Sequence, residues 1–493
     1  MKNVTLLLIC TLLFGISCSQ NRGQDSEKKK TDRPNVIIIY TDDHGFADLG
    51  IQGQEKDLKT PNLDKLAKEG VLLTAGYVTA PQCVPSRAGL LAGRYQERFG
   101  VDQNQSIPFP LDEKMIAQRM KDAGYMTGMA GKWHLEPNHV QKRWIVENLP
   151  EIANKERYER QDIPFSKKIP YKATEKGFDF VYQGTRQDYW ANYTLEGERI
   201  EKQMIRNDDY RLDIQTQATV SFIDMNHDNP FFFYLAYYAP HVPLEATEKY
   251  LSRFPEDMPE RRRLCLAMLS AIDDGVGLIK ETLRKYGIEE NTIIFFAGDN
   301  GAPLVGHDPD PNFKEIPVNV RAAWDGSLNT PWIGEKGMLS EGGIRTPFVV
   351  NWPIGLPGGK VYRRPVMAFD FAATALALAG TKVPEELDGV NIIPYLTGVE
   401  QGDPHAALYW RFWDQAAVRS GDWKYIISKE REYLFNVETD LHEKENLIDL
   451  HPETAQKLKE LLEKWSSELK YPGIFGPTAR SAEHWFDYYF EGE

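Results

Sequence analysis

The run Val36-Ile37-Ile38-Ile39-Tyr40, followed by Thr41-Asp42-Asp43, predicts the fold of this chain. An unbroken apolar run is typical of a strand that is buried on both faces, as in a parallel sheet covered by helices. Similar runs lie at residues 231–237 and 292–297, with an amphipathic helical pattern over 260–285 between them. This alternation predicts an α/β fold in which helices cover both faces of a large, mainly parallel sheet.

Turn and capping residues mark further elements. Thr60-Pro61-Asn62 predicts the start of a helix, with Thr60 as its cap and Pro61 at its first position, and Gly70 marks its end. Residues 112–123 form a second predicted helix, which Gly124 ends.

The pattern of predicted secondary structure changes near residue 398. Short strands are predicted at 417–419, 423–427 and 433–436, before an amphipathic helix over 452–469. We therefore expect a large domain over 34–397 and a smaller one over 398–493. The aromatic residues of the last segment, 484–490, are expected to pack against the body or to line the cleft.

Polar side chains follow the three predicted strands at their carboxyl ends. Asp42 and Asp43 follow the first strand, His241 follows the second, and Asp299 and Asn300 follow the third. Ligands of open α/β sheets bind at this edge, so we expect these residues to share a site. Two acidic residues after one strand, with an acid and an amide after another, offer four oxygen ligands. Such a set suits a hard cation, calcium or magnesium, and we favour calcium.

The 493 residues carry a formal net charge of −14, which argues against non-specific nucleic-acid binding. An anionic substrate would therefore have to be attracted by a local basic cleft.

The N-terminus predicts export. Residues 1–17 read as a signal peptide, because Lys2 precedes an apolar run that is too short to span a bilayer comfortably. Gly15-Ile16-Ser17-Cys18 is similar to a bacterial lipobox, with Gly15 where leucine is usual, and predicts lipidation of Cys18. Ordinary cleavage at the same small residues is the alternative. Residues 18–33 are polar throughout and are predicted to form a disordered tether.

Two cysteines, Cys83 and Cys265, remain in the part that is predicted to fold. A disulfide between them is one interpretation for an exported protein. In the other, Cys265 belongs to the buried stripe of the helix over 260–285. Cys83 precedes an apolar helical run, and a helix N-terminus at this point would favour an anion.

The segment Cys83-Val84-Pro85-Ser86-Arg87, with Ala88-Gly89-Leu90-Leu91-Ala92-Gly93-Arg94 after it, resembles the signature of the type I sulfatases in the alkaline-phosphatase-like superfamily. The resemblance extends from Pro34 to about Leu450 and implies that family's fold, with an antiparallel sheet and a helix in the small C-terminal domain. It also implies that a formylglycine-generating or anaerobic sulfatase-maturating enzyme oxidises Cys83 to formylglycine (3-oxoalanine).

The same resemblance assigns the site residues. It implies one Ca²⁺ ion, bound by Asp42, Asp43, Asp299, Asn300 and the modified Cys83. The catalytic residues that it implies are Cys83, Arg87, Lys132 and His134 of Gly131-Lys132-Trp133-His134, His241, and Lys336.

Each residue type suits its implied role. The cation and Arg87 would favour deprotonation of the formylglycine diol, which attacks sulfur. Lys132, Lys336 and His241 would surround the sulfate oxygens, and His241 or Lys336 would protonate the leaving oxygen. His134 would then take a proton from the second hydroxyl, which expels sulfate from the sulfoenzyme intermediate.

Two segments are candidates for substrate binding. The stretch between His134 and Asp188 carries aromatic and charged residues, and the candidates in it or directly after it are Trp144, Tyr158, Arg186, Tyr189 and Trp190. They form either a sugar-binding rim or part of the core. The polar, proline-containing stretch from Gly306 to Trp324 reads as a substrate loop, with His307 as the predicted specificity residue.

These observations together predict an exported, lipid-anchored sulfatase at a bacterial membrane, in the periplasm or on the outer membrane. Its expected substrate is a sulfated polysaccharide or its oligosaccharides, either algal, such as ulvan or carrageenan, or a glycosaminoglycan. Two alternatives stay open. One is a phosphodiester or phosphonate monoester hydrolase of the same superfamily, and the other is a surface glycan-binding protein without turnover.

Overall fold

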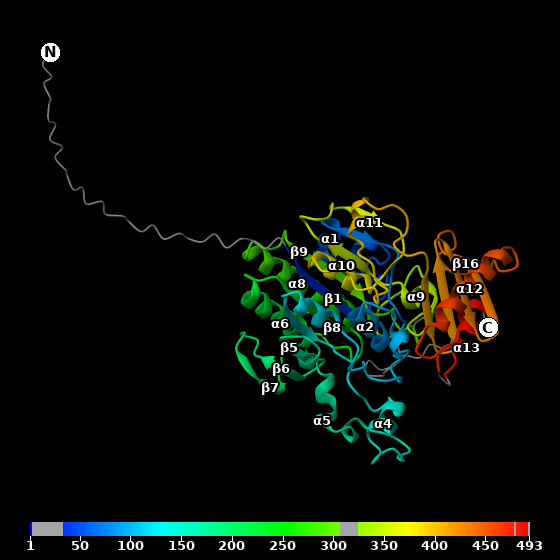
Figure 1. Ribbon diagram of the computed structural model, residues 1–493, viewed down its shortest axis with the longest axis horizontal. Helices are drawn as coiled ribbons and strands as arrows, with labels where there is room; N and C mark the ends of the chain where they lie inside the picture. Colours follow the sequence, from blue (N-terminus) through cyan, green and yellow to red (C-terminus); the bar gives the residue numbers. More distant parts are fainter. Residues whose placement is uncertain (2–32, 306–323, 478–479, 492–493) are drawn as a thin grey trace. The chain divides into compact units, whose positions relative to one another are not determined.

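Strand β1 (Asn35–Asp42) lies in the middle of a ten-stranded sheet, between β9 (Thr292–Gly298) and β8 (Phe231–Pro240) (Figure 1). The computed structural model describes Met1 and residues 33–305, 324–477 and 480–491. The other strands of this sheet are β2 (Val71–Leu73), β4 (Met126–Gly131), β5 (Phe180–Gly184), β6 (Asp188–Tyr193), β7 (Arg199–Arg206), β10 (Phe348–Asn351) and β11 (Lys360–Tyr362).

The sheet is parallel in its middle, antiparallel pairs lie on either side of this middle, and the edge strand β11 pairs parallel with β2. Its strand order is β11-β2-β10-β9-β1-β8-β4-β5-β6-β7. Strands β9, β1, β8, β4 and β5 run parallel, whereas β10 on one side and β6 and β7 on the other pair antiparallel with their neighbours. The predicted mainly parallel α/β sheet is confirmed.

Successive side chains of β1 enter two different cores, which explains its continuous apolar run. Val36 and Ile38 belong to one core, and Ile37 and Ile39 belong to the other. The first core also contains side chains of α2 (Cys83–Ala92), α3 (Ile116–Asp122) and α10 (Asp370–Leu378). The second core contains side chains of α1 (Pro61–Lys68), α6 (Arg211–Asn226) and α8 (Glu260–Lys285). Helices therefore cover both faces of the sheet.

Most of the predicted elements lie where they were expected, and two details differ. Helix α3 starts at Ile116 rather than at residue 112. Pro61 is the first residue of α1, but the Thr60 side chain does not cap this helix. Its hydroxyl instead accepts a hydrogen bond from the N–H of Gly50 and donates one to Asp64. No helix among the described residues is long and apolar enough to cross a bilayer.

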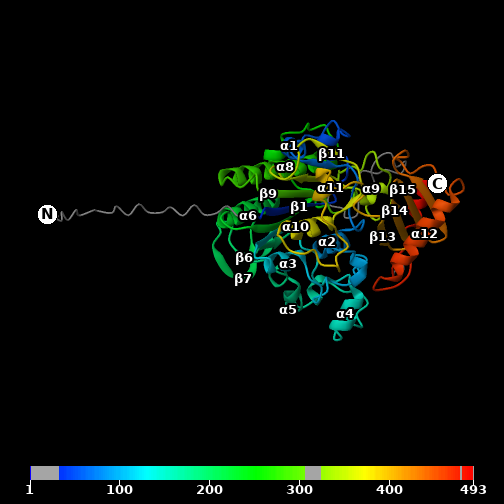
Figure 2. The ribbon, with the colours of Figure 1, turned by 45° about the horizontal axis from the view of Figure 1, so that its top comes forward.

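A separate antiparallel sheet follows the large one in the chain. It contains β13 (Leu408–Phe412), β14 (Gln415–Ser420), β15 (Trp423–Ser428) and β16 (Arg431–Asn436), and α12 (Pro452–Ser467) packs on it. The implied antiparallel sheet is confirmed. Figures 1 and 2 both show this sheet (orange) beside the short helix α9 (Glu341–Ile344) of the main body. The boundary at 397/398 stays a prediction.

The remaining elements are short and complete the described fold. Strands β3 (Gly76–Tyr77) and β12 (Val366–Met367) form a two-stranded sheet. The other short helices are α4 (Lys142–Asn148), α5 (Phe165–Lys168), α7 (Glu248–Leu251), α11 (Ile393–Thr397) and α13 (Glu483–Phe486).

A buried ionic cluster joins the small sheet to the main body. Nζ of Lys424, in β15, lies 2.9 Å from Oε1 of Glu341 in α9 and 2.9 Å from Oε1 of Glu443. The side chains of all three residues are at most 1% exposed. Glu341 also accepts hydrogen bonds from Tyr77 and Arg345. Breaking such a cluster on one side leaves buried charge without compensation.

We expect Lys424→Met to destabilise the protein by about 3–5 kcal/mol, because two carboxylates would stay buried without their shared cation. Chemical denaturation followed by circular dichroism measures this loss. The control is Lys382→Met, which breaks the exposed pair with Glu385 and should leave the midpoint unchanged. If both variants had the same free energy of unfolding, the buried ionic cluster would not contribute to stability.

Candidate active site

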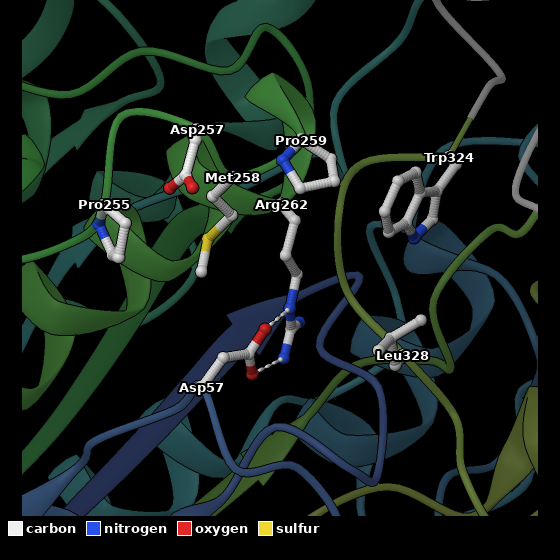
Figure 3. Close-up of a pocket in the computed structure, with 8 residues that line it drawn as sticks. All are labelled: Asp57, Pro255, Asp257, Met258, Pro259, Arg262, Trp324 and Leu328. Carbon is white, nitrogen blue, oxygen red and sulfur yellow. Dashed lines mark hydrogen bonds and ion pairs between the residues drawn. The ribbon is translucent and has the colours of Figure 1, made fainter.

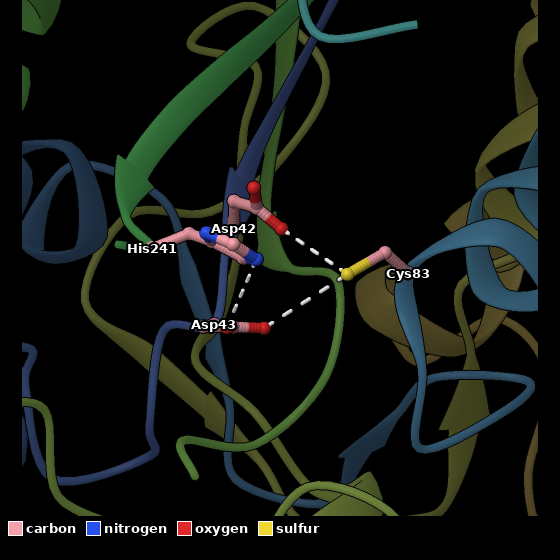
Figure 4. Close-up of side chains that lie close together, drawn as sticks. All are labelled: Asp42, Asp43, Cys83 and His241. Carbon is pink, nitrogen blue, oxygen red and sulfur yellow. Dashed lines mark hydrogen bonds and ion pairs between the residues drawn. The ribbon is translucent and has the colours of Figure 1, made fainter. Parts of the chain in front are cut away.

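The ends of β1 and β9 meet the start of α2 at one buried site. Asp42 and Asp43 lie at the end of β1, Asp299 and Asn300 follow β9, and Cys83 is the first residue of α2. Sγ of Cys83 lies 3.4 Å from Oδ1 of Asp42 and 4.0 Å from Oδ1 of Asp43 (Figure 4). All five side chains are buried. The structure therefore brings these five predicted residues together at the carboxyl edge of the sheet.

Three cations surround these acidic groups: Arg87 and Lys132 are buried, and Lys336 is 19% exposed. Nζ of Lys132, which follows β4, lies 2.7 and 2.6 Å from the two carboxylate oxygens of Asp42. Lys336 donates to Oδ1 of Asp43 at 2.5 Å, and its Nζ lies 3.5 Å from Sγ of Cys83. Together with Arg87, these lysines form a cationic cradle around residue 83.

Arg87 occupies the inner side of the cradle. The helical rise from Cys83 places it one turn further along α2. Its guanidinium donates to Oδ2 of Asp299 at 2.7 Å and to the Tyr234 hydroxyl at 3.2 Å. It also lies 3.5 Å from Oδ1 of Asp42. A fully buried arginine in these contacts is a fixed positive charge.

Burial and charge oppose each other in the carboxylates. Burial raises the pKa of Asp42, but the cations around it, Lys132 above all, outweigh burial and hold this pKa well below its usual value. Burial and the neighbouring Asp42 raise the pKa of Asp299 to about 7, although Arg87 opposes them. Negative charge is therefore stabilised more strongly at Asp42 than at Asp299.

His241 lies on the open side of the carboxylates. Its Nε2 is 3.7 Å from Oδ2 of Asp43, its ring stacks on Tyr238, and its Nδ1 is 2.5 Å from the Val242 carbonyl oxygen. Burial lowers the pKa of His241 to about 4, against the opposing effect of Asp42 and Asp43. The imidazole is therefore neutral at neutral pH, and the bond to Val242 places its proton on Nδ1.

His134 lies two residues after Lys132, in the segment that follows β4. Its backbone is in the left-handed region, with φ of 60°, and Nδ1 is buried without a hydrogen-bond partner among the described residues. Burial, followed by the charge of Lys132, lowers the pKa of His134 well below its usual value. A neutral imidazole with an unpartnered nitrogen is able to accept a proton.

The residues present fit a hard divalent cation. Oδ1 of Asn300 is buried without a hydrogen-bond partner among the described residues, although buried amide oxygens normally have one. The oxygens of Asp42, Asp43 and Asp299 complete a donor set that suits calcium or magnesium. Ligand atoms of Asp42, Asp43, Cys83 and His241 lie within 4.8 Å of one another. A thiol at residue 83 is a soft ligand, whereas an oxygen at that position would match the set.

Sequence reasoning missed two tyrosines of β8 that contact the cradle. Tyr234 accepts a hydrogen bond from Arg87, and the ring centroid of Tyr238 lies 5.1 Å from Nζ of Lys132. Both residues belong to a run of aromatic strand residues. Nothing in this run distinguishes them from core positions, because the contact depends on pairing of β8 with its neighbours.

All four aromatic residues predicted as a possible sugar-binding rim are buried in the structure. Trp190 is a correction: only 5% of it is exposed, it packs against Phe165, and its Nε1 donates to Thr174, so its ring is not an open stacking surface. The core interpretation also holds for the other aromatic candidates, Trp144, Tyr158 and Tyr189. Arg186 is exposed between β5 and β6 and stays a predicted substrate contact.

Two predicted residues, Cys18 and His307, lie outside the described residues. The disulfide interpretation is wrong, because Cys83 and Cys265 are both free and buried. Cys265 lies in α8 within the second core, which confirms the other interpretation, that it belongs to the buried stripe of this helix.

A cavity of about 400 Å³ lies elsewhere, at the start of α8 (Figure 3). Arg262 in its wall is bound by Asp57 and Asp48, so its charge is compensated. The cavity shares no residue with the cradle. The residues that line it are Asp57, Pro255, Asp257, Met258, Pro259, Arg262, Trp324 and Leu328.

Comparison with known proteins identifies relatives of the whole folded chain. The sulfatase family model matches residues 34–381, and a model described as N-sulphoglucosamine sulphohydrolase, C-terminal, matches residues 331–469. Arylsulfatase J of Mus musculus is 28% identical over 91% of this chain and 80% of its own length. The N-acetylgalactosamine-6-O-sulfatase of Bacteroides thetaiotaomicron is 28% identical over 94% of this chain and 99% of its own length.

Solved structures agree with these matches. The structure of Ps i-CgsB in complex with k-i-k-neocarrahexaose is 30% identical, with a TM-score of 0.72, and covers 92% of this chain and 97% of its own. The phosphonate monoester hydrolase SpPMH from Silicibacter pomeroyi, at 17% identity and a TM-score of 0.58, shares the fold alone. The chain belongs to the sulfatase family and is a sulfuric ester hydrolase.

Proposed function

We propose that this sulfatase releases sulfate from a sulfated polysaccharide or from its oligosaccharides, by cleavage of the S–O bond. The observation that carries this proposal is the cationic cradle around residue 83, where Lys132, Lys336 and Arg87 converge beside the carboxylates. Ps i-CgsB was solved with a carrageenan-type hexasaccharide, and the Bacteroides relative acts on a sulfated sugar. Both likenesses favour a carbohydrate substrate.

The thiol of Cys83 is a poor nucleophile in this site. Burial raises its pKa above the usual value, and Asp299 adds to this effect against the opposing lysines, so that it stays protonated. We infer that Cys83 is oxidised to formylglycine by a formylglycine-generating or anaerobic maturating enzyme, which supplies a hydrated aldehyde as an oxygen nucleophile.

The carboxylates are proposed to hold one Ca²⁺ ion. Asp42, Asp43, Asp299 and Asn300 would hold it together with residue 83, and its charge would favour the deprotonated form of an oxygen nucleophile.

The protein's own side chains complete the chemistry. Lys132 and Lys336 are proposed to bind the non-bridging oxygens of the sulfate, where fixed charges stabilise the transition state without reorganisation. Of the two expected donors we favour Lys336 for protonation of the leaving sugar oxygen, because its ammonium lies 3.5 Å from Sγ of Cys83, whereas His241 is neutral and carries its proton on Nδ1 against Val242. Nδ1 of His134, buried and unpartnered, is proposed to take up the proton whose removal frees the product.

Two alternatives predict different behaviour. A phosphodiester or phosphonate monoester hydrolase would prefer aryl phosphodiesters, and SpPMH supports this alternative by its fold alone. A surface glycan-binding protein would keep Cys83 as a thiol and would not need the neutral His134 imidazole.

We also propose export and attachment to a bacterial membrane, in the periplasm or on the outer membrane, through a lipid on Cys18. The lipobox-like Gly15-Ile16-Ser17-Cys18 supports this proposal. We expect the mature protein to begin at Cys18 with its lipid, which mass spectrometry of protein from the native membrane would detect. A mature N-terminus at any other residue contradicts it.

We expect the matured enzyme to release sulfate from at least one member of a panel of sulfated carrageenan, ulvan and glycosaminoglycan oligosaccharides. It should also hydrolyse an aryl sulfate faster than an aryl phosphodiester. Ion chromatography measures the sulfate, and mass spectrometry of the peptide that contains residue 83 measures its oxidation. Cys83→Ala, the control, should fold normally and release none. A thiol in protein from the native organism would favour the glycan-binding alternative.

Removal of calcium should abolish turnover, because the carboxylates would lose the charge that stabilises an anionic nucleophile. Activity after dialysis against a chelator should return with Ca²⁺, and calorimetry of the dialysed enzyme should show one binding site. Asn300→Ala should weaken the calorimetric affinity, whereas the exposed Asn446→Ala should not. Full activity of the metal-free enzyme would contradict the assignment of the ion.

A further inference from the structure

Hydrogen bonds hold the turn that carries Lys336, residues 335–339, from two sides; we call it the Lys336 turn. The backbone N–H of Lys336 donates to the Ala302 carbonyl at 3.1 Å, and that of Gly337 donates to the Pro81 carbonyl at 2.9 Å. Both acceptors belong to the main body, and Pro81 lies two residues before Cys83. These two bonds fix one side of the turn close to the nucleophile position.

Gln415, the first residue of β14, forms hydrogen bonds with the other side of the Lys336 turn. Its Nε2 donates to the Gly337 carbonyl at 2.6 Å, and its Oε1 accepts a hydrogen bond from the Leu339 N–H at 2.9 Å. Gln415 is fully buried. One side-chain amide therefore satisfies two backbone groups on the C-terminal side of Lys336, although it comes from the small sheet.

Residues near the end of the described chain close the same turn. Gly337 has φ of +101°, and a Cβ built on it would lie 2.4 Å from Cη2 of Trp485. The Tyr489 hydroxyl donates to Oε1 of the buried Glu335 at 3.2 Å. The two residues beside Lys336 thus each contact the C-terminal segment.

This segment is itself fastened to the small sheet. The N–H of Ala482 donates to Asp414 at 2.7 Å, and Trp485 stacks on Trp413 with a centroid distance of 5.4 Å. Ion pairs join Lys429 to Glu483 and Arg431 to Asp487. The small sheet and the C-terminal segment are therefore joined to each other, and together they hold the Lys336 turn in place.

We propose that Gln415 is a positioning residue for catalysis, which holds the Lys336 turn so that Nζ of Lys336 stays beside residue 83, with Trp485 as its partner in this role. The proposal rests on the proposed function for the part of Lys336 in turnover. The ion pair with Asp43 fixes one end of the Lys336 side chain and the backbone fixes the other, so the position of Nζ also depends on how firmly the backbone is held. A small displacement of such a group lowers turnover steeply.

The test is a double-mutant cycle in the matured full-length enzyme, with 4-nitrophenyl sulfate as the probe. Gln415→Met removes both hydrogen bonds and keeps a similar volume, and we expect it to lower kcat about 10- to 100-fold. In a Lys336→Ala background the same substitution should change kcat by less than about twofold, because the group that it positions is absent. Gln415→Glu keeps the acceptor for Leu339 and should lose less activity than Gln415→Met.

Asn446→Leu is the matched control. The Asn446 amide also binds the backbone on both sides: it accepts from the N–H groups of Leu434 and Ile448 and donates to the carbonyl of Glu432. It does not contact the Lys336 turn, so kcat should be unchanged. An unchanged kcat in Gln415→Met, or an equal loss in the Lys336→Ala background, would overturn the proposal.

Amide hydrogen exchange gives a readout that does not depend on activity. We expect faster exchange in the peptide that spans Gly337 and Leu339 for Gln415→Met, and unchanged exchange for Asn446→Leu. If the wild-type enzyme does not cleave the aryl sulfate or any oligosaccharide of the panel, the proposed function fails. If amide exchange of this peptide is unchanged in Gln415→Met, then Gln415 does not hold the Lys336 turn, and the proposal is overturned whatever the activity is.

Discussion

The carboxylates at the ends of β1 and β9 depend on the cations that surround them. Asp42, Asp43 and Asp299 are buried side by side, and without compensation their mutual repulsion and desolvation would prevent this arrangement. Compensation comes from α2, from the end of β4 and from the turn before α9, through Arg87, Lys132 and Lys336. The cations that compensate the buried carboxylates at the centre of the sheet are therefore the same ones that would bind a sulfate group.

Sequence alone predicted what local pattern and strand ends determine. The apolar run of β1 and the acidic pair after it were enough to predict a parallel sheet and a site at its carboxyl edge. Helix α8 has the predicted bounds, and the start of α2 at Cys83 was expected. The catalytic candidates on the large sheet lie together because adjacent parallel strands end at one edge. Their roles remain proposals, as do those of Arg186 and His307.

Features that depend on distant partners were not predictable. The Thr60 hydroxyl accepts from the N–H of Gly50 instead of from a backbone N–H of α1, and this contact depends on the path of the loop between Gly50 and Thr60. Trp190 has the composition of a sugar-stacking residue, but packing against Phe165 encloses it. Gln415 lies far along the chain from Gly337, and no local pattern marks a glutamine at a strand start as a partner of a catalytic turn. Composition gives residue types, whereas these contacts follow from the assembled tertiary structure.

The burial of Cys83 has a consequence for the order of events in the cell. With 1% of its surface exposed, the thiol is out of reach of another enzyme once the sheet has closed. A maturating enzyme would therefore have to bind this segment as an unfolded peptide. The groups that enclose residue 83, at positions 299 and 336, are synthesised later than the cysteine. A growing chain would thus present Cys83 before the residues that enclose it are synthesised, and the proposed oxidation would compete with folding for this interval.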